Sequence, residues 1–166
     1  MNKIINANCA FTMPVLIAIV IASGMTGCDK NNIVSIREKA EMGDLKAQDA
    51  LGKKLCSGEG VVINFREAII WFRKAAERGY KPAQAHLGRL YMYGLGIEQD
   101  EAEGLKWIRL AAENGDSDGQ RYLGYAYRDG MGVAKDENSA QEWFRRSLNG
   151  LLLVAERGDV EAQANL

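Results

Sequence analysis

The sequence predicts an all-α protein in which antiparallel helix pairs stack into a solenoid. One reason is a period of 36 residues, at which Trp71, Trp107 and Trp143 recur. A second is a series of glycine pairs with the same period, Gly58 and Gly60, Gly94 and Gly96, and Gly130 and Gly132. Glycine accepts the left-handed backbone conformation with which helices often end, so these pairs predict helix ends. Units of this length cannot bury their apolar faces alone and must stack on their neighbours.

The composition is ordinary for a globular protein. The chain has 166 residues, of which 47% are hydrophobic and 26% are charged, and its net charge is -1. The length suits a single domain. Because so small a charge creates no strong positive field, the sequence predicts no nucleic-acid partner.

The amino-terminal segment differs from the rest of the chain. Lys3 is the only charged residue among the first 28, and an apolar run follows from Pro14 to Ala22. A basic start, a short apolar core and small residues before position 28 predict an export signal peptide over residues 1–27. The apolar run is shorter than the roughly 20 residues that span a bilayer comfortably.

This segment ends in Met25-Thr26-Gly27-Cys28, which resembles the lipobox of bacterial lipoproteins. The resemblance implies that Cys28 is lipidated and anchors the protein in the bacterial cell envelope, facing the periplasm. Asp29 resembles an inner-membrane retention signal, and the choice between inner and outer membrane stays open. Residues 28–35 are then expected to form a polar tether. The alternatives are an ordinary secretory signal and an uncleaved membrane anchor.

Residues 36–166 are predicted to form the repeat domain. Its expected parts are a half-repeat at 36–43, repeats at about 45–79, 81–115 and 117–158, and a truncated helix at 159–166. Each full repeat holds two helices, and each helix begins near a residue that can cap it. The expected caps are Asp44 and three capping boxes, Ser35 with Glu38, Asn64 with Glu67, and Asp100 with Glu103.

Apolar residues at helical spacing predict the core. Ala47, Leu51 and Leu55 recur every four residues and share one helix face. The dipeptide Leu51-Gly52 and its copies are expected to mark the point where the two helices of a pair touch. The three tryptophans are the largest apolar residues, so they are expected to dominate the buried surface.

The third repeat is irregular, because its Ala-Glu-x-Gly end comes at residues 155–158, seven residues later than the period predicts. Seven residues are nearly two helical turns, which favours one continuous helix over 137–157. A break at Asn149-Gly150 is the alternative. The surplus apolar stretch from Leu151 to Val154 is expected to pack in the core, or else to meet a partner. The last residues, 159–166, begin a fourth repeat that caps the last pair, or that a premature stop has shortened.

The phrase A-x-A-Q-x-x-L-G, followed by Y-x-x-G-x-G and D-x-x-x-A-x-x-W, resembles the Sel-1-like repeat, a relative of the tetratricopeptide repeat. The fullest match runs from Ala83 through Gly88, Gly94 and Asp100 to Trp107. The resemblance implies a right-handed superhelix of antiparallel helix pairs. It also implies a protein partner, because members of this family are mostly adaptors or inhibitors, often in bacterial envelopes.

Two groups of relatives suggest narrower functions. Cysteine-rich members are reported to bind or hydrolyse β-lactams, but they carry a cysteine pair in each repeat. Here Met92 and Arg128 stand where Cys56 stands in the first repeat. Other exported members resemble immunity proteins against lipase effectors of type VI secretion. The leading hypothesis is therefore an envelope interaction module, with an immunity protein next and a β-lactam or cell-wall hydrolase last.

The sequence predicts no catalytic residue, no metal site and no cofactor. His86 is a lone histidine at a position that differs between repeats, where we expect partial exposure, and no second histidine or cysteine cluster accompanies it. Cys9 lies in the signal peptide and Cys28 is the anchor, so no pair remains for an internal disulfide. Cys56 is expected to pack as a buried thiol, and redox chemistry is the alternative.

A binding surface is the remaining prediction. In stacked helix pairs the first helices line the concave face, and their side chains outside the core meet the partner. The predicted partner-binding residues are Lys53, Arg89, Met92, Tyr93, Arg121, Tyr125 and Arg128. Asp49 and Cys56 lie on the same face. Four cations give the face a basic character and predict an acidic protein surface or peptide as its ligand, while a merely solvated face is the alternative.

Overall fold

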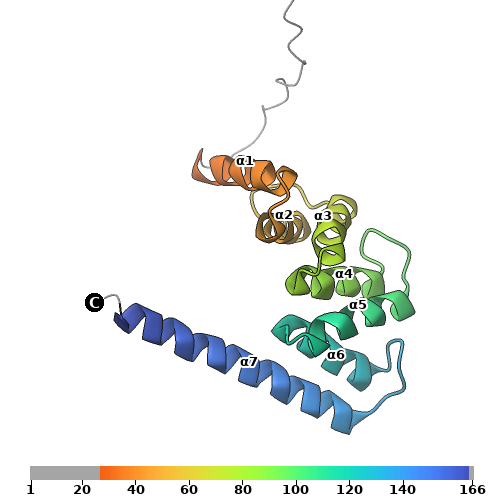
Figure 1. The fold of residues 1–166 in the computed structure, drawn as a ribbon. Helices are drawn as coiled ribbons and strands as arrows, with labels where there is room; N and C mark the ends of the chain where they lie inside the picture. The colour runs from red at the N-terminus through yellow and green to blue at the C-terminus, as the bar shows by residue number, and fades with distance from the viewer. Residues whose placement is uncertain (1–26, 165–166) are drawn as a thin grey trace, which may run out of the picture.

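The computed structural model describes the backbone of residues 27–164, and it confirms the all-α solenoid. This part of the chain contains helices and no strand. Their bounds are α1 Gly27–Glu41, α2 Leu45–Ser57, α3 Phe65–Glu77, α4 Lys81–Tyr93, α5 Glu101–Glu113, α6 Ser117–Asp129 and α7 Glu137–Ala164. Figure 1 shows them following one another along a curved stack, with α1 at one end of it and α7 at the other. The expected signal peptide lies outside the described residues except for Gly27. No described helix is both long and apolar enough to span a bilayer.

Side-chain caps begin most of the helices. Asp44 accepts a hydrogen bond from the backbone N–H of Ala47 at 2.9 Å, and Asp116 accepts one from Gly119 at 2.7 Å. Asn64 and Asp100 do the same for α3 and α5. Each of these oxygens satisfies a backbone donor that has no partner within its own helix.

The predicted capping boxes at Asn64 and Asp100 form only by half, since the side chain of the first residue accepts the expected bond but its backbone N–H does not donate to the glutamate. The backbone N–H groups of Asn64, Asp100 and Asp136 donate instead to carbonyls nine residues earlier, at Leu55, Tyr91 and Tyr127. These three bonds recur at the 36-residue period and tie the start of each second helix to the preceding first helix. Glu67, the glutamate of the Asn64 box, is left to pair with Arg37 at 2.7 Å.

A repeated glutamine links each helix pair to the next. The side-chain amides of Gln48, Gln84 and Gln120 donate to the carbonyls of Ala40, Ala76 and Ala112. Each carbonyl lies eight residues earlier, near the end of the preceding helix. The bond therefore satisfies an acceptor that the helix itself leaves open.

Close contacts at glycine hold the two helices of each pair together, as the sequence predicted. A Cβ atom on Gly52 would lie 2.6 Å from the Phe72 ring, and one on Gly124 would lie 2.5 Å from the Phe144 ring. In the middle repeat a Cβ on Gly88 would lie 2.7 Å from the carbonyl oxygen of Gly104. Here two glycines face each other, and backbone packs against backbone.

The core differs from the prediction in which aromatic residues it buries most deeply. Trp71 is buried, but Trp107 and Trp143 are only half-buried. The residue after the tryptophan points inward in the first two repeats, where Phe72 and Ile108 are fully buried. Leu51, Leu87 and Leu123 are fully buried as well. The tryptophans cover the edge of the core, where an indole can pack its ring and keep its N–H near polar groups.

The first helix is longer than predicted. The structure continues α1 through residues 28–35, where the sequence predicted a polar tether, and places Ser35 within the helix instead of at its cap. Ala40 near its end is buried, and Ile36 packs against the core of the first repeat.

At the other end, α7 confirms the predicted continuous helix and extends it. The helix runs from Glu137 to Ala164 with no break at Asn149-Gly150, so the expected separate helix at 159–166 is part of α7 as far as Ala164. Figure 1 shows the end of α7 pointing away from the stack. Leu152 is 60% exposed, which contradicts core packing for that residue. The side chains of Leu151, Leu153 and Val154 lie outside the described part.

Candidate functional site

A groove of about 620 Å³ crosses the first helices of the three repeats. Helix α2 contributes most of one wall, including Asp49, Lys53 and Cys56. Helix α4 contributes His86 and Arg89, and α6 contributes Tyr122. Of the seven predicted partner-binding residues, Lys53 and Arg89 line this groove.

The lining of the groove includes a buried pair, His86 and Asp49. His86 Nδ1 lies 2.8 Å from Asp49 Oδ1, and the imidazole stacks on the Phe72 ring with centroids 5.1 Å apart. The prediction that His86 and Asp49 are exposed was wrong, since each residue is only 6% exposed. The reason is that α2 and α4 approach closely enough for the two side chains to satisfy each other, which polar groups require when buried.

The predicted cations fall into two classes. Arg121 pairs with Asp118 at 2.5 Å, and Arg128 makes two bonds of 2.8 Å to the carboxylate of its neighbour Asp129. Neither of these arginines lines the groove. Arg89 and Lys53 do line it, and within the described residues no carboxylate lies within 4 Å of either. The basic character of the groove therefore comes from two of the four predicted cations.

Three of the predicted arginines lie over tyrosine rings in cation–π contacts. The guanidinium carbon of Arg121 lies 5.0 Å from the centroid of the Tyr122 ring, and that of Arg89 lies 5.9 Å from it on the groove side. Arg128 lies over Tyr125 at 4.9 Å. Such contacts favour a cation over an aromatic face and restrict its side chain.

The prediction that Met92 binds the partner was wrong. It is 1% exposed and packs with Leu105 and Ile108 in the core of the second repeat pair. Gly104 has no side chain to hold α5 away, because a Cβ there would lie 2.8 Å from the Met92 backbone N. The close approach of α5 therefore buries Met92. Tyr93 next to it is 45% exposed but does not line the groove.

Sequence reasoning missed Tyr122 as a groove residue. Ala50, His86 and Tyr122 occupy one repeat position, and all three line the groove. The signal was present, since a small residue, an imidazole and a phenol at one position of a repeat indicate a surface without a common packing role. Lys54 and Glu59 were missed as well, and they form an ion pair of 2.9 Å at the rim.

Burial changes the chemistry of two groove residues. It raises the pKa of the Cys56 thiol, although the positive charge of Arg89 acts in the opposite direction. Burial also raises the pKa of the Tyr122 hydroxyl. Cys56 makes no hydrogen bond to His86, and a raised thiol pKa is the opposite of what an activated nucleophile needs. Cys56 is half-buried, in line with the packing role that was predicted for it.

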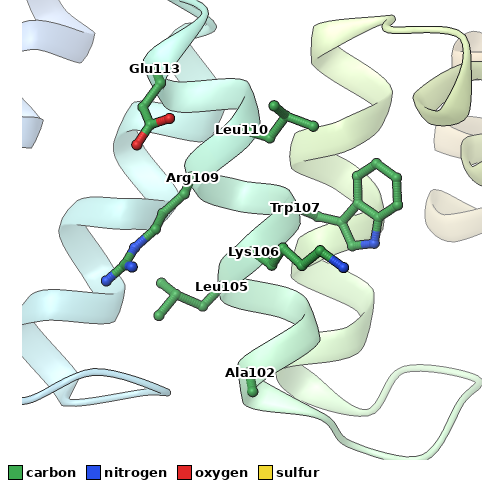
Figure 2. Close-up of a pocket in the computed structure, with 7 residues that line it drawn as sticks. All are labelled: Ala102, Leu105, Lys106, Trp107, Arg109, Leu110 and Glu113. Carbon is green, nitrogen blue, oxygen red and sulfur yellow. The ribbon is translucent and has the colours of Figure 1, made fainter.

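A second hollow of about 490 Å³ lies on the other helix layer, along α5. Figure 2 shows Trp107 and Arg109 on opposite sides of that helix, with Leu110 and Glu113 further along it. Leu110 is 41% exposed. The hollow contains one acidic and two basic side chains but no pair that would act together as acid and base. Elsewhere in the described residues, no group of three or more His, Cys, Asp and Glu side chains is placed to hold a metal ion.

Comparison with solved structures shows relatives of the same architecture. A protective antigen of uropathogenic Escherichia coli strains, which displays an SLR fold, is 40% identical with a TM-score of 0.65, over 73% of this chain and 26% of its own. A Sel1 repeat protein from Oxalobacter formigenes is 34% identical with a TM-score of 0.64, over 74% of this chain and 50% of its own. The chain thus spans between a quarter and half the length of these two proteins.

A third structure shares the fold alone. The cysteine-rich protein B of Helicobacter pylori is 22% identical, with a TM-score of 0.58 over 73% of this chain and 90% of its own. No curated protein matches the sequence. The Sel1 repeat itself matches three times in succession, at residues 45–80, 81–116 and 117–150, in register with α2 to α7. These three matches cover most of the chain, and the protein belongs to the Sel1 repeat family.

Proposed function

We propose that this chain is an envelope-anchored adaptor or inhibitor, which holds a protein partner in the groove across α2, α4 and α6. Sel1 repeats are scaffolds for protein–protein interaction and are not typically enzymes. The observation that carries the proposal is the contrast between repeat positions. Leu51, Leu87 and Leu123 are identical and fully buried, whereas Lys53, Arg89 and Tyr125, two residues further along, all differ.

This contrast separates the two roles of the first helices. Identical residues at a repeat position stack the pairs, since every pair meets the same neighbours. Two repeat positions that differ between copies bring side chains to one groove, namely Lys53, His86, Arg89 and Tyr122, while Tyr125 does not line it. Of these, His86 also joins two repeats through Asp49. Arginine and tyrosine are the residue types that dominate binding energy at protein interfaces.

Attachment to the envelope is the second part of the proposal. It rests on residues 1–27, which have the pattern of an export signal, and on the lipobox-like sequence that ends at Cys28. A lipid on Cys28 would place the solenoid on the periplasmic side of a membrane. Replacing Cys28 by alanine is expected to abolish labelling of the protein by radioactive palmitate and to release it from the membrane fraction. Equal labelling of the wild type and the variant would contradict the anchor.

An inhibitor of this kind could be an immunity protein that neutralises a secreted lipase effector. The groove suits that role because it is preformed. A hydrolase acting on β-lactams or the cell wall gains no support from the groove, where the Cys56 thiol is not bonded to His86 and burial raises its pKa.

Affinity capture from envelope extracts tests the groove. The baits are the full-length chain, Ala50→Trp, which fills the groove, and Ala102→Trp, which places the same side chain on the outer face of α5. A partner retained by the wild type and by Ala102→Trp but lost by Ala50→Trp supports the proposal. Retention by all three baits places binding elsewhere on the protein. Circular dichroism must show that both variants are folded.

A further inference from the structure

Arg89 lies on the middle first helix of the stack and lines the groove. Its Nε atom is shielded from solvent and donates no hydrogen bond within the described residues. An unpaired donor of this kind costs free energy, and a charged one costs more than a neutral one. Native proteins rarely leave such a group without a partner, which is a protein group, an ordered water or a ligand.

The carboxylates near Arg89 are already in use. Asp49 is held by His86 at 2.8 Å, and Glu59 by Lys54 at 2.9 Å. Asp118, on the next first helix, is held by Arg121 at 2.5 Å. These carboxylates therefore pair with other residues, and the guanidinium of Arg89 pairs with none of them.

The charge of the groove fits a single negative group. Its lining contains three cations, Lys53, Lys54 and Arg89, and two carboxylates, Asp49 and Glu59, so that its net charge is +1 when His86 is neutral. Arg89 lines the groove together with Cys56 and Tyr122. One carboxylate would bring the groove to neutrality.

We propose that Arg89 receives the carboxylate of one Asp or Glu side chain on the partner protein, with Lys53 as a second cation beside it. The inference rests on the proposed function, because it names the chemistry of the partner at that groove. A guanidinium binds a carboxylate through two parallel hydrogen bonds, which fix orientation as well as charge. Tyr122, whose ring lies 5.9 Å from the guanidinium, restricts the side chain before the partner arrives.

A phosphate group fits the groove less well. It carries a charge of about -1.5 to -2 at neutral pH, and this would exceed the net positive charge of the lining. It would also lie close to Asp49 and Glu59, which already occupy the groove. Repulsion from these two carboxylates favours the singly charged ligand.

Selection from a random dodecapeptide library tests the inference. Each peptide is fused at its carboxyl end, so that side chains supply its only carboxylates, and the full-length protein is the immobilised target. The selected peptides are expected to be enriched in Asp and Glu, and changing the enriched acid to its amide is expected to weaken binding roughly tenfold to a hundredfold. Absence of binding peptides, or of this enrichment, would overturn the inference.

Two variants make the result specific to Arg89. Arg89→Gln is expected to lose the tenfold to hundredfold preference for acid over amide. Arg145→Gln, which removes an exposed cation paired with Glu142 on α7, is expected to keep it. The inference fails if Arg89→Gln still distinguishes the acid from the amide. It also fails if millimolar inorganic phosphate displaces the peptide where acetate at equal ionic strength does not.

Affinity capture with Arg89→Gln as a further bait distinguishes failure of this inference from failure of the proposed function. A partner that Ala50→Trp loses but Arg89→Gln retains unchanged would leave the groove as the binding site and remove Arg89 as its carboxylate receptor. A partner that both variants retain would remove both proposals. Loss from both variants, together with retention by Arg145→Gln, supports both.

Discussion

His86 and Asp49 join the first helices of two successive repeats through a buried contact of 2.8 Å between Nδ1 and Oδ1. Their side chains are only 8% and 9% exposed, so each is largely shielded from solvent. His86 Nε2 also faces Asp118 on α6, at 3.9 Å. The imidazole of the second repeat thus lies near carboxylates of the first and the third repeats.

Removing either member of this pair is expected to destabilise the fold. His86→Ala leaves Asp49 buried without its partner, and Asp49→Ala leaves the imidazole N–H without an acceptor, at a cost of about 1–3 kcal/mol each in the free energy of unfolding. The double variant is expected to lose less stability than the two single variants together, because the second change removes a buried group that the first change has already left without a partner. Urea unfolding of the four proteins measures the coupling. Strict additivity would show that the contact contributes nothing.

A methyl group at Gly88 is expected to disrupt the middle helix pair. The Cβ of Gly88→Ala would lie 2.7 Å from the Gly104 carbonyl oxygen and 2.9 Å from the backbone N of Ile108, and backbone cannot move aside as a side chain can. Overpacking of this kind costs about 1–3 kcal/mol. Thermal unfolding followed by circular dichroism measures the loss.

Gly150 provides the matched control for Gly88. It also lies within a helix, but a Cβ there would meet only the Ser117 side chain, at 2.8 Å, which can rotate. Gly150→Ala is expected to leave stability unchanged or raise it by up to about 1 kcal/mol, because alanine favours the helical backbone over glycine. Equal losses at both sites would contradict the role of backbone contact at Gly88.

Asp116 is expected to contribute to the pH dependence of the free energy of unfolding. Burial raises the pKa of this carboxyl above its ordinary value of 3.8. The folded state therefore holds the proton more tightly than the unfolded chain, and this contribution is fully present below pH 3.8 and is lost as the pH rises through the folded pKa. In the variant Asp116→Asn, the amide side chain would still cap α6 through its oxygen but would not titrate.

The test of this effect compares the two proteins across pH. The variant is expected to gain stability relative to the wild type as the pH rises from about 3.5 to 7, with the difference smallest at the acidic end. Urea unfolding at several pH values gives the free energies. A difference that does not vary with pH would show that the folded state does not perturb Asp116.

The reactivity of Cys56 is expected to report the charge at Arg89. Burial raises the thiol pKa, and the Arg89 cation lowers it in part. In a chain with Cys9 and Cys28 replaced by serine, Arg89→Gln is therefore expected to slow the reaction of Cys56 with a disulfide reagent near neutral pH, because less thiolate is present. Lys53→Gln is the control for loss of a nearby positive charge. A faster reaction in Arg89→Gln would show that the arginine acts by shielding the thiol.

The sequence alone was sufficient for the architecture. Repetition of Leu51, Gly52 and Trp71 at one period required a stack of identical pairs, and local chemistry at Asp44, Asn64 and Asp100 placed the helix starts. These features depend on neighbours within a few residues or on the next copy of the same unit, so they can be read from the order of residues.

The site was less predictable, because contacts between repeats decide it. The sequence shows that Met92 and Arg121 lie on first helices. It does not show that a glycine on α5 draws one into the core, or that Asp118 neutralises the other. His86 was expected at the surface for the same reason, since its partner Asp49 lies 37 residues away.

The period, the caps and the glycine contacts were therefore determined by the sequence itself, because each results from short-range geometry that repeats along the chain. Only the tertiary structure decided which charges remain available. That question depends on the distances between side chains of different helices, and it leaves Arg89 without a carboxylate where Arg121 and Arg128 each have one.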